Sequence, residues 1–260
     1  MRIATWNINS VRTRTQRALN LISKHDIDVL CLQETKVKDD KFPREAFEDA
    51  GLHVTCHGLN QWNGVAILAR DSEPLEIRRG LPGDPDDSHS RYLEAAVHGV
   101  IVASLYLPNG NPQPGPKFDY KLAWFERLIA HARALHDAPA PVVLAGDYNV
   151  IPAARDVYNP AAWADDALFR PATREAFQSL LGLGLTDALR AVNDEPGQYT
   201  FWDYQAGAWQ KNWGLRIDHL LMSPQASDRL IDVGIDSYVR AWEKPSDHVP
   251  VWADLDFETA

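Results

Sequence analysis

The sequence predicts an α/β protein in which two β-sheets pack face to face and helices cover them. Three observations lead to this fold class. Short runs rich in β-branched residues recur along the chain and are bounded by Gly, Pro, Asn or Asp, which is typical of strands. A few amphipathic helical segments are mixed with these runs. The length of 260 residues and the hydrophobic content of 45% suit one large domain, so we expect residues 1–260 to form a single unit.

Short strands are the dominant signal in the chain. The apolar runs at 29–32 and 142–145 predict strands covered on both faces, whereas the alternation at 93–98 predicts an edge or half-buried strand. The expected strands span residues 2–8, 28–33, 64–69, 92–98, 100–106, 141–145, 217–222 and 249–255.

Helices are fewer than strands. Residues 119–135 place Leu122, Phe125 and Ile129 on one face, which is an amphipathic stripe. A second helix is expected at 13–24, and a third at 173–181 with Thr173 as its N-cap.

Composition narrows the classes of function. The net charge of −10 argues weakly against a nucleic-acid binder, although bound cations or a local basic patch can reverse the sign at a site. The two cysteines lack zinc-type spacing and fit a reducing compartment. No signal peptide is visible, and no apolar stretch approaches the roughly 18 residues that span a membrane. We therefore expect a cytoplasmic protein with no membrane contact.

Five short polar motifs adjoin the predicted strands. They are Trp6-Asn7, Gln33-Glu34, Gly146-Asp147-Tyr148-Asn149, Arg216-Ile217-Asp218-His219 and Ser246-Asp247-His248. A buried charge is costly unless it is paired or bound to a metal, so five such motifs predict one shared polar site around a divalent cation. Oxygen ligands favour Mg²⁺ or Mn²⁺. The remaining groups would suit hydrolysis at phosphorus, which depends on positioning and electrostatics.

Each motif has an ordinary structural interpretation when it is taken alone. A Gly-Asp-x-Asn segment is usually a turn, a Ser-Asp-His segment is usually a loop or N-cap, and Arg-Ile-Asp could be a surface ion pair. Their joint occurrence beside strands favours the shared site. His219 points away from Asp218 in a regular strand, so we do not expect it to be catalytic. His25, His131 and His136 are expected at the surface.

The motifs resemble those of the exonuclease III family of abasic (AP) endonucleases, in the endonuclease/exonuclease/phosphatase superfamily. The match runs in family order from Met1 to about Phe257 and includes Tyr106-Leu107-Pro108-Asn109-Gly110 and the segment 244–252. The resemblance implies the four-layer α/β sandwich of DNase I. It also implies Mg²⁺-dependent hydrolysis, with Mn²⁺ as a substitute, of the phosphodiester 5′ to abasic sites. The resemblance further implies 3′→5′ exonuclease and 3′-phosphatase or phosphodiesterase activities in base excision repair. The implied partner is double-stranded DNA with abasic sites or blocked or recessed 3′ ends, bound by a monomer.

The resemblance also implies roles for individual residues. Asp147 orients or deprotonates the attacking water, Asn149 steadies it, and His248, held by Asp218, contacts a phosphate oxygen. Tyr106 reaches the phosphate or the leaving oxygen. Glu34 is the principal metal ligand, and the implied metal site comprises Asn7, Glu34, Asp147, Asn149, Asp247 and His248.

A pocket for the base-less sugar is implied at Phe201, Trp202, Leu215 and Ile217. Two positions depart from the animal-type enzymes. Asn9 replaces an acid, which places more of the metal affinity on Glu34, and Leu215 replaces a Trp, which changes the shape of the pocket.

Contacts with DNA are expected from the loops at 81–85, 108–116 and 153–171, and Trp163 is among the tryptophans near predicted loops that are free to touch a ligand. For the basic residues, ordinary surface charge is the alternative to a phosphate contact. The candidates are Lys36, Lys117, Lys121, Arg155, Arg170, Lys211 and Arg216.

Two other functions fit parts of the pattern. One is a phosphodiesterase of the same fold acting on a non-DNA substrate such as a phosphoinositide or nucleotide, and the other is a non-catalytic binding module. The segment 244–252 and the motif Arg216-Ile217-Asp218 favour the DNA-repair branch.

Overall fold

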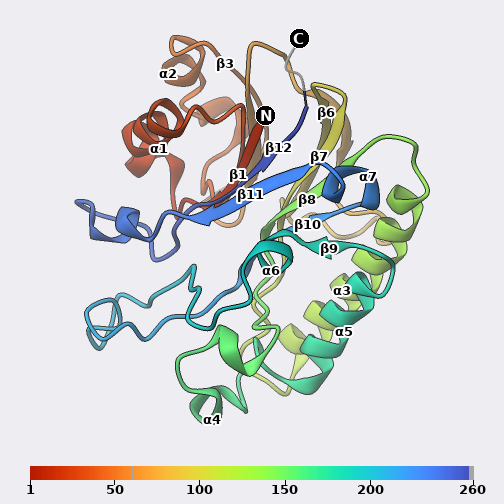
Figure 1. The fold of residues 1–260 in the computed structure, drawn as a ribbon, viewed down its shortest axis with the longest axis vertical. Coiled ribbons are helices and arrows are strands. Elements are labelled where there is room, and N and C mark those ends of the chain that lie inside the picture. Colours follow the sequence, from red (N-terminus) through yellow and green to blue (C-terminus); the bar gives the residue numbers. More distant parts are fainter. Residues whose placement is uncertain (60, 258–260) are drawn as a thin grey trace.

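Two six-stranded β-sheets packed face to face form the centre of the computed structural model, which describes residues 1–59 and 61–257. The strand order is β11-β12-β1-β2-β4-β3 in one sheet and β5-β6-β7-β8-β10-β9 in the other. Helices lie on the outer sides of both sheets, with α1 and α2 on one side and α3 and α5 on the other (Figure 1). The predicted four-layer α/β sandwich is confirmed.

The eight predicted strands are all present, with ends that differ from the prediction by at most two residues. The first sheet contains β1 (Arg2–Asn7), β2 (Val29–Gln33), β3 (Leu52–His57), β4 (Val65–Arg70), β11 (Leu230–Ile235) and β12 (Val251–Leu255). The second contains β5 (Leu75–Arg79), β6 (Tyr92–Val97), β7 (Val100–Tyr106), β8 (Val142–Asp147), β9 (Thr186–Asp187) and β10 (Asp218–Met222). The strands that the sequence analysis missed are β3, β5, β9 and β11, which are the edge strands of the two sheets.

The helices begin earlier than predicted. The long ones are α1 (Val11–His25), α3 (Pro116–His136) and α5 (Pro171–Leu181), and the short ones are α2 (Arg44–Glu48), α4 (Pro160–Trp163), α6 (Ala188–Val192) and α7 (Pro224–Ser227). Three 3₁₀ turns span Asp39–Lys41, Ala154–Asp156 and Ser237–Ala241. Thr173 is not an N-cap. It lies inside α5, where its buried hydroxyl donates to the carbonyl of Ala167 at 2.7 Å, while Pro171 opens the helix.

Central strands alternate their side chains between two apolar layers. In β1, Ile3 points into the layer between the sheets, and its neighbours Ala4 and Trp6 point toward α1. A third layer lies between the second sheet and the helices α3 and α5, where Trp124 and Phe125 are buried. Both faces of the central strands are therefore covered, as their continuous apolar runs predict.

Strand direction brings the polar strand ends to one edge of the sandwich. β1 runs parallel to β2, and β7 runs parallel to β8, so Asn7, Gln33, Tyr106 and Asp147 all lie at carboxyl ends. β10 runs antiparallel to β8 and begins with Asp218 opposite Asp147. Contacts across the two sheets join β1 to β8 and β10.

Arg216, expected at the surface, is instead a buried structural residue that is 1% exposed. Its Nε lies 2.6 Å from Asp156 Oδ1, and its Nη1 lies 2.9 Å from Asp187 Oδ2. Asp156 also accepts from Arg190 Nη2 at 2.5 Å. The guanidinium is therefore not available to contact a DNA phosphate.

The histidines only partly follow the prediction. His219 is buried, bonds to the carbonyl of Val150 at 3.1 Å, and its pKa is lowered to about 4 by burial. His219 is therefore a structural residue and does not pair with Asp218, as the sequence analysis expects. His25 and His131 are mostly buried rather than at the surface, and they contact Tyr238 Oη and Glu94 Oε2, each at 2.7 Å.

Among residues 1–59 and 61–257, no helix has both the length and the apolar character required to cross a membrane.

We expect Asp156→Asn to lower the free energy of unfolding by about 3–5 kcal/mol, because it removes a buried carboxylate that pairs with both Arg216 and Arg190. Urea-induced unfolding measures this loss. The control is Asp194→Asn, which removes an exposed pair with Arg155 and should cost less than about 1 kcal/mol. Equal and small losses in the two variants would contradict the structural role of Arg216.

Candidate active site

Just after three strands end, the backbone adopts a left-handed conformation. Asn9, Glu34 and Asn149 follow β1, β2 and β8 with φ of 47°, 52° and 48°. Non-glycine residues seldom adopt positive φ, and such strain is often found at functional sites. Gly146 has a different reason for being glycine, because a Cβ built there would lie 2.0 Å from the carbonyl oxygen of Leu105.

Asn7 joins the two sheets at the polar edge. Its Nδ2 donates to Glu34 Oε1 at 2.8 Å and to Asp147 Oδ2 at 3.0 Å. Ligand atoms of Glu34, Asp147 and His248 all lie within 4.8 Å of one another. Carboxylate and amide oxygens are the donors that Mg²⁺ prefers, and a nearby histidine is compatible with them. The donor set thus fits a divalent cation.

Glu34 is held in its ionised form. Burial alone would raise the pKa of its carboxyl, but the charge of Lys36 and hydrogen bonds from Asn7 and Lys36 lower that pKa overall. Lys36 Nζ lies 2.7 Å from Glu34 Oε2 and 2.6 Å from Asn9 Oδ1. Lys36 is therefore engaged at the site rather than displayed on the outer surface.

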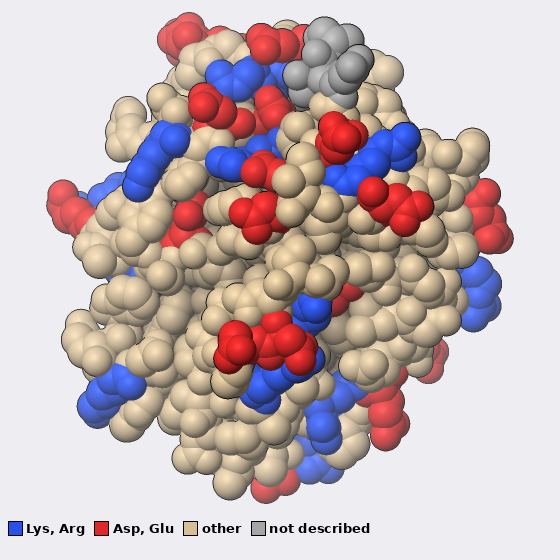
Figure 2. Space-filling view, in the orientation of Figure 1, with Lys and Arg blue, Asp and Glu red and all other residues tan. Residues whose placement is uncertain are grey.

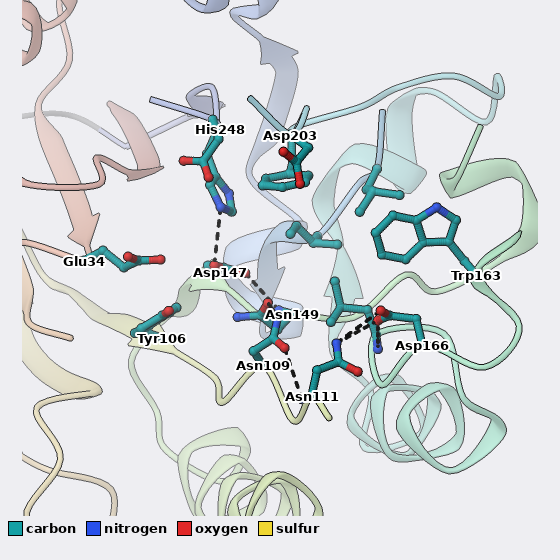
Figure 3. A pocket seen from close by; sticks show the side chains of 15 residues that line it. Glu34, Tyr106, Asn109, Asn111, Asp147, Asn149, Trp163, Asp166, Asp203 and His248 are labelled. Atoms are coloured by element: carbon teal, nitrogen blue, oxygen red, sulfur yellow. Dashed lines mark hydrogen bonds and ion pairs between the residues drawn. The ribbon is translucent and has the colours of Figure 1, made fainter. Parts of the chain in front are cut away.

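His248 is oriented by Asp218. The imidazole Nδ1 lies 2.9 Å from Asp218 Oδ2, and Nε2 faces Asp147 Oδ2 at 3.8 Å (Figure 3). Burial lowers the pKa of His248, but Asp218 and Asp147 raise it more strongly, to about 10. The ring is therefore cationic at neutral pH. The Phe201 ring packs edge-on against it with centroids 4.9 Å apart.

Asp147 and Asn149 share a network with the segment after β7. The backbone N–H of Asn149 donates to Asp147 Oδ1 at 2.9 Å, and Asn149 Nδ2 donates to the carbonyl of Leu107 at 2.9 Å. Asn109 Nδ2 donates to Asn149 Oδ1 at 3.2 Å. Burial raises the pKa of Asp147, and the lowering by the charge of His248 is smaller. Asp147 is therefore a stronger base than an exposed aspartate.

Tyr106 and Asp247 complete the polar wall. Burial, with the nearby Glu34 and Asp147 carboxylates, raises the pKa of Tyr106, so its phenol stays protonated. Asn9 Nδ2 donates to Asp247 Oδ1 at 3.0 Å. In this chain the neutral amide at position 9 thus serves as a hydrogen-bond donor to Asp247.

A cavity of about 310 Å³ is lined in part by Glu34, Tyr106, Asp147, Asn149, Asp247 and His248. Phe201, Leu215 and Ile217, for which the sequence analysis predicts a sugar pocket, form an apolar part of its wall. Trp202 lies outside the cavity. Its ring is buried in the layer beneath the first sheet, and its indole N–H donates to Asn212 Oδ1 at 3.1 Å. Successive residues of an extended segment face opposite ways, so Phe201 and Trp202 cannot both face the cavity.

Several further residues line the cavity. Trp163 was expected to be free to touch a ligand, and Asn109 belongs to the motif Tyr106-Leu107-Pro108-Asn109-Gly110. No specific role was predicted for either residue. No individual role was predicted for Asn111, Asp166, Leu168 or Asp203, although the first three come from the loops 108–116 and 153–171 that were expected to contact DNA. They lie in loops, where no apolar run marks a strand end.

Lys121, a candidate phosphate contact, is instead fully buried beneath the cavity. Its Nζ donates to the carbonyls of Asn109 at 3.0 Å and Asn149 at 2.5 Å. Burial lowers its pKa to about 7, against the opposing charges of Asp147 and Asp166. This lysine ties together the two loops that carry Asn109 and Asn149.

We expect Lys121→Met to lower both the melting temperature and kcat, because the backbone carbonyls of Asn109 and Asn149 lose their donor and Asn149 is released. The control is Arg133→Met, an exposed basic residue further along the same helix, which should change neither quantity. Thermal melts and initial rates measure the effects. Wild-type values for Lys121→Met would contradict the positioning role.

Comparisons with known proteins agree with this geometry. Residues 4–248 match the model of the endonuclease/exonuclease/phosphatase family. Exodeoxyribonuclease III of Haemophilus influenzae is 36% identical over 98% of this chain and 100% of its own length. Among solved structures, an AP endonuclease from Archaeoglobus fulgidus is 36% identical with a TM-score of 0.94, and a 3′ phosphatase from Neisseria bound to a product DNA hairpin is 41% identical with a TM-score of 0.95. Each structural match covers 99% of this chain and 100% of the other.

Proposed function

The chain belongs to the endonuclease/exonuclease/phosphatase family, and we propose that it is a Mg²⁺-dependent DNA-repair nuclease that cleaves the phosphodiester 5′ to abasic sites and processes 3′ ends. Its class is that of phosphodiester hydrolases of the exonuclease III and AP endonuclease type. The 3′ activities are those of a 3′→5′ exonuclease and a 3′-phosphatase or phosphodiesterase. The convergence of Glu34, Asp147 and His248 on one cavity carries the proposal.

The metal would be held chiefly by Glu34 and Asp147, with the other predicted ligands, Asn7, Asn149, Asp247 and His248, around them. Mg²⁺ is the ion that these oxygen donors suit, and Mn²⁺ would substitute. A bound dication would supply Lewis-acid stabilisation of the charge that develops on the phosphate.

Side chains of this protein supply the remaining chemistry. Asp147, with its raised pKa, orients the attacking water and accepts its proton. Asn149 commits one amide hydrogen to Leu107 and offers the other to the water or a phosphate oxygen. His248, cationic beside Asp218, donates to a phosphate oxygen, and Tyr106 donates its phenolic proton toward the phosphate or the leaving oxygen.

The cavity suits a sugar that has lost its base. Its apolar wall can pack against a deoxyribose, and base-less positions are the cheapest to rotate out of a duplex. The Neisseria relative that was solved with a DNA hairpin supports double-stranded DNA as the partner. Acidic and basic side chains are interspersed on the face drawn in Figure 2, so this face offers DNA no broad basic surface.

The direct test measures Mg²⁺-dependent nicking of a duplex with one abasic site, with and without a chelator. We expect Asp147→Asn and His248→Asn to lower kcat at least about 100-fold, because both groups act in the transition state. His53→Asn, an exposed histidine on β3, is the matched control and should keep wild-type rates.

Two outcomes would overturn the proposal. Failure to act on an abasic duplex or a 3′ end across a range of salt, with turnover of a soluble phosphodiester, would favour a non-DNA phosphodiesterase of the same fold. Unchanged activity in the Asp147 and His248 variants would favour a site elsewhere.

A further inference from the structure

The cavity carries more negative charge than the proposed chemistry requires. Among the described residues, its lining includes no Lys or Arg, but it includes the carboxylates Glu34, Asp147, Asp166, Asp203 and Asp247. Glu34, Asp147 and Asp247 lie at the proposed metal centre. Asp166 lies across the cavity from Glu34, beside Trp163 (Figure 3).

Asp166 is fixed in place by hydrogen-bond donors without net charge. Asn111 Nδ2 donates to its two oxygens at 3.1 and 3.2 Å, and the backbone N–H of Leu168 donates to Oδ1 at 2.8 Å. The N–H of Ala167 donates to Asn111 Oδ1 at 3.1 Å and fixes that amide in turn. Within the described part of the chain, no Lys or Arg nitrogen lies within 4.0 Å of this carboxylate.

Its neighbour Asp165 is a natural contrast. That side chain is 94% exposed and pairs with Arg170 at 2.9 Å, outside the cavity. Of two adjacent aspartates, Asp165 thus pairs with an arginine at the surface, and Asp166 lines the cavity wall.

The position of Asp166 can affect which group on the 3′ oxygen of a bound sugar the cavity accepts. If the scissile phosphate binds at Asp147 and His248 and the sugar packs against Phe201 and Leu215, the 3′ oxygen of that sugar would extend toward the wall that carries Asp166. A residue inside a strand carries a second phosphate on this oxygen, whereas a terminal residue carries a hydroxyl. A carboxylate accepts a hydrogen bond from a hydroxyl and repels a phosphate.

We propose that Asp166 is a specificity-determining residue that favours 3′-terminal units with a free hydroxyl over residues inside an intact strand. This inference rests on the proposed function and narrows it to a substrate class. It assigns the cavity chiefly to processing of 3′ ends, with internal abasic sites as poorer substrates.

The experiment compares two duplexes that contain the same stable tetrahydrofuran abasic residue in the same sequence. In one duplex the strand ends at this residue with a 3′-hydroxyl, and in the other the strand continues. Hydrolysis on the 5′ side of the residue is measured as kcat/KM for each duplex. We expect wild-type protein to prefer the terminal substrate. We expect Asp166→Asn to raise the internal-to-terminal ratio about tenfold, which corresponds to about 1.4 kcal/mol.

Asp165→Asn is the matched control, because it removes the same charge one residue away and outside the cavity. Its ratio should stay within about twofold of the wild-type value. Thermal melts establish that the variants fold. If Asp166→Asn does not, Asp166→Ser removes the same charge, keeps an oxygen acceptor for the Leu168 amide and takes its place.

An unchanged ratio in the folded Asp166 variant, or an equal change in both variants, overturns the inference and leaves the proposed function intact. Absence of hydrolysis of either duplex by the wild-type protein is a different result, because it contradicts the proposed function itself.

Discussion

A single side-chain amide holds together two carboxylates that belong to different sheets. Glu34 follows the first sheet and Asp147 ends a strand of the second, and both accept from Nδ2 of Asn7. The segment that carries His248 is tied to the same strand, since Ser246 Oγ donates to the carbonyl of Asn7 at 2.7 Å and Trp6 Nε1 donates to the carbonyl of His248 at 3.1 Å. The site therefore depends on the position of β1, whose last residue, Asn7, reaches both Glu34 after β2 and Asp147 at the end of β8.

The carboxylates at this edge outnumber the cationic groups, so the site requires a bound cation. Glu34, Asp147, Asp218 and Asp247 face one cationic ring, His248, and the ammonium of Lys36. A phosphate would be repelled by such a centre unless a dication were bound there, and the same ion would make hydrolysis faster. At the far wall of the cavity, no Lys or Arg nitrogen of the described residues pairs with Asp166 within 4.0 Å. One cavity thus combines an end that accepts a phosphate with an end that disfavours one.

The sequence predicted the parts of the structure that buried apolar runs mark. The central strands and the polar residues at their ends were recognisable, because a charge beside such a run is unusual. The edge strands β3, β5, β9 and β11 were missed because they are partly exposed and lack a continuous apolar run; β5 is exposed along its whole length. Arg216 and Lys121 were assigned to the surface because their partners, such as Asp156, are distant in the sequence. The choice between Phe201 and Trp202 depends on which face of one segment meets the cavity, and Asp166 lies in a loop without periodicity.

The central claim is that the edge where β1, β2 and β8 end holds a divalent cation. Anomalous diffraction from crystals soaked with Mn²⁺ tests it most directly. The account predicts a strong anomalous peak at coordination distance from the Glu34 carboxylate, which is lost in crystals of Glu34→Gln. A saturating soak that gives no peak at this edge, or a peak that Glu34→Gln leaves unchanged, would contradict it.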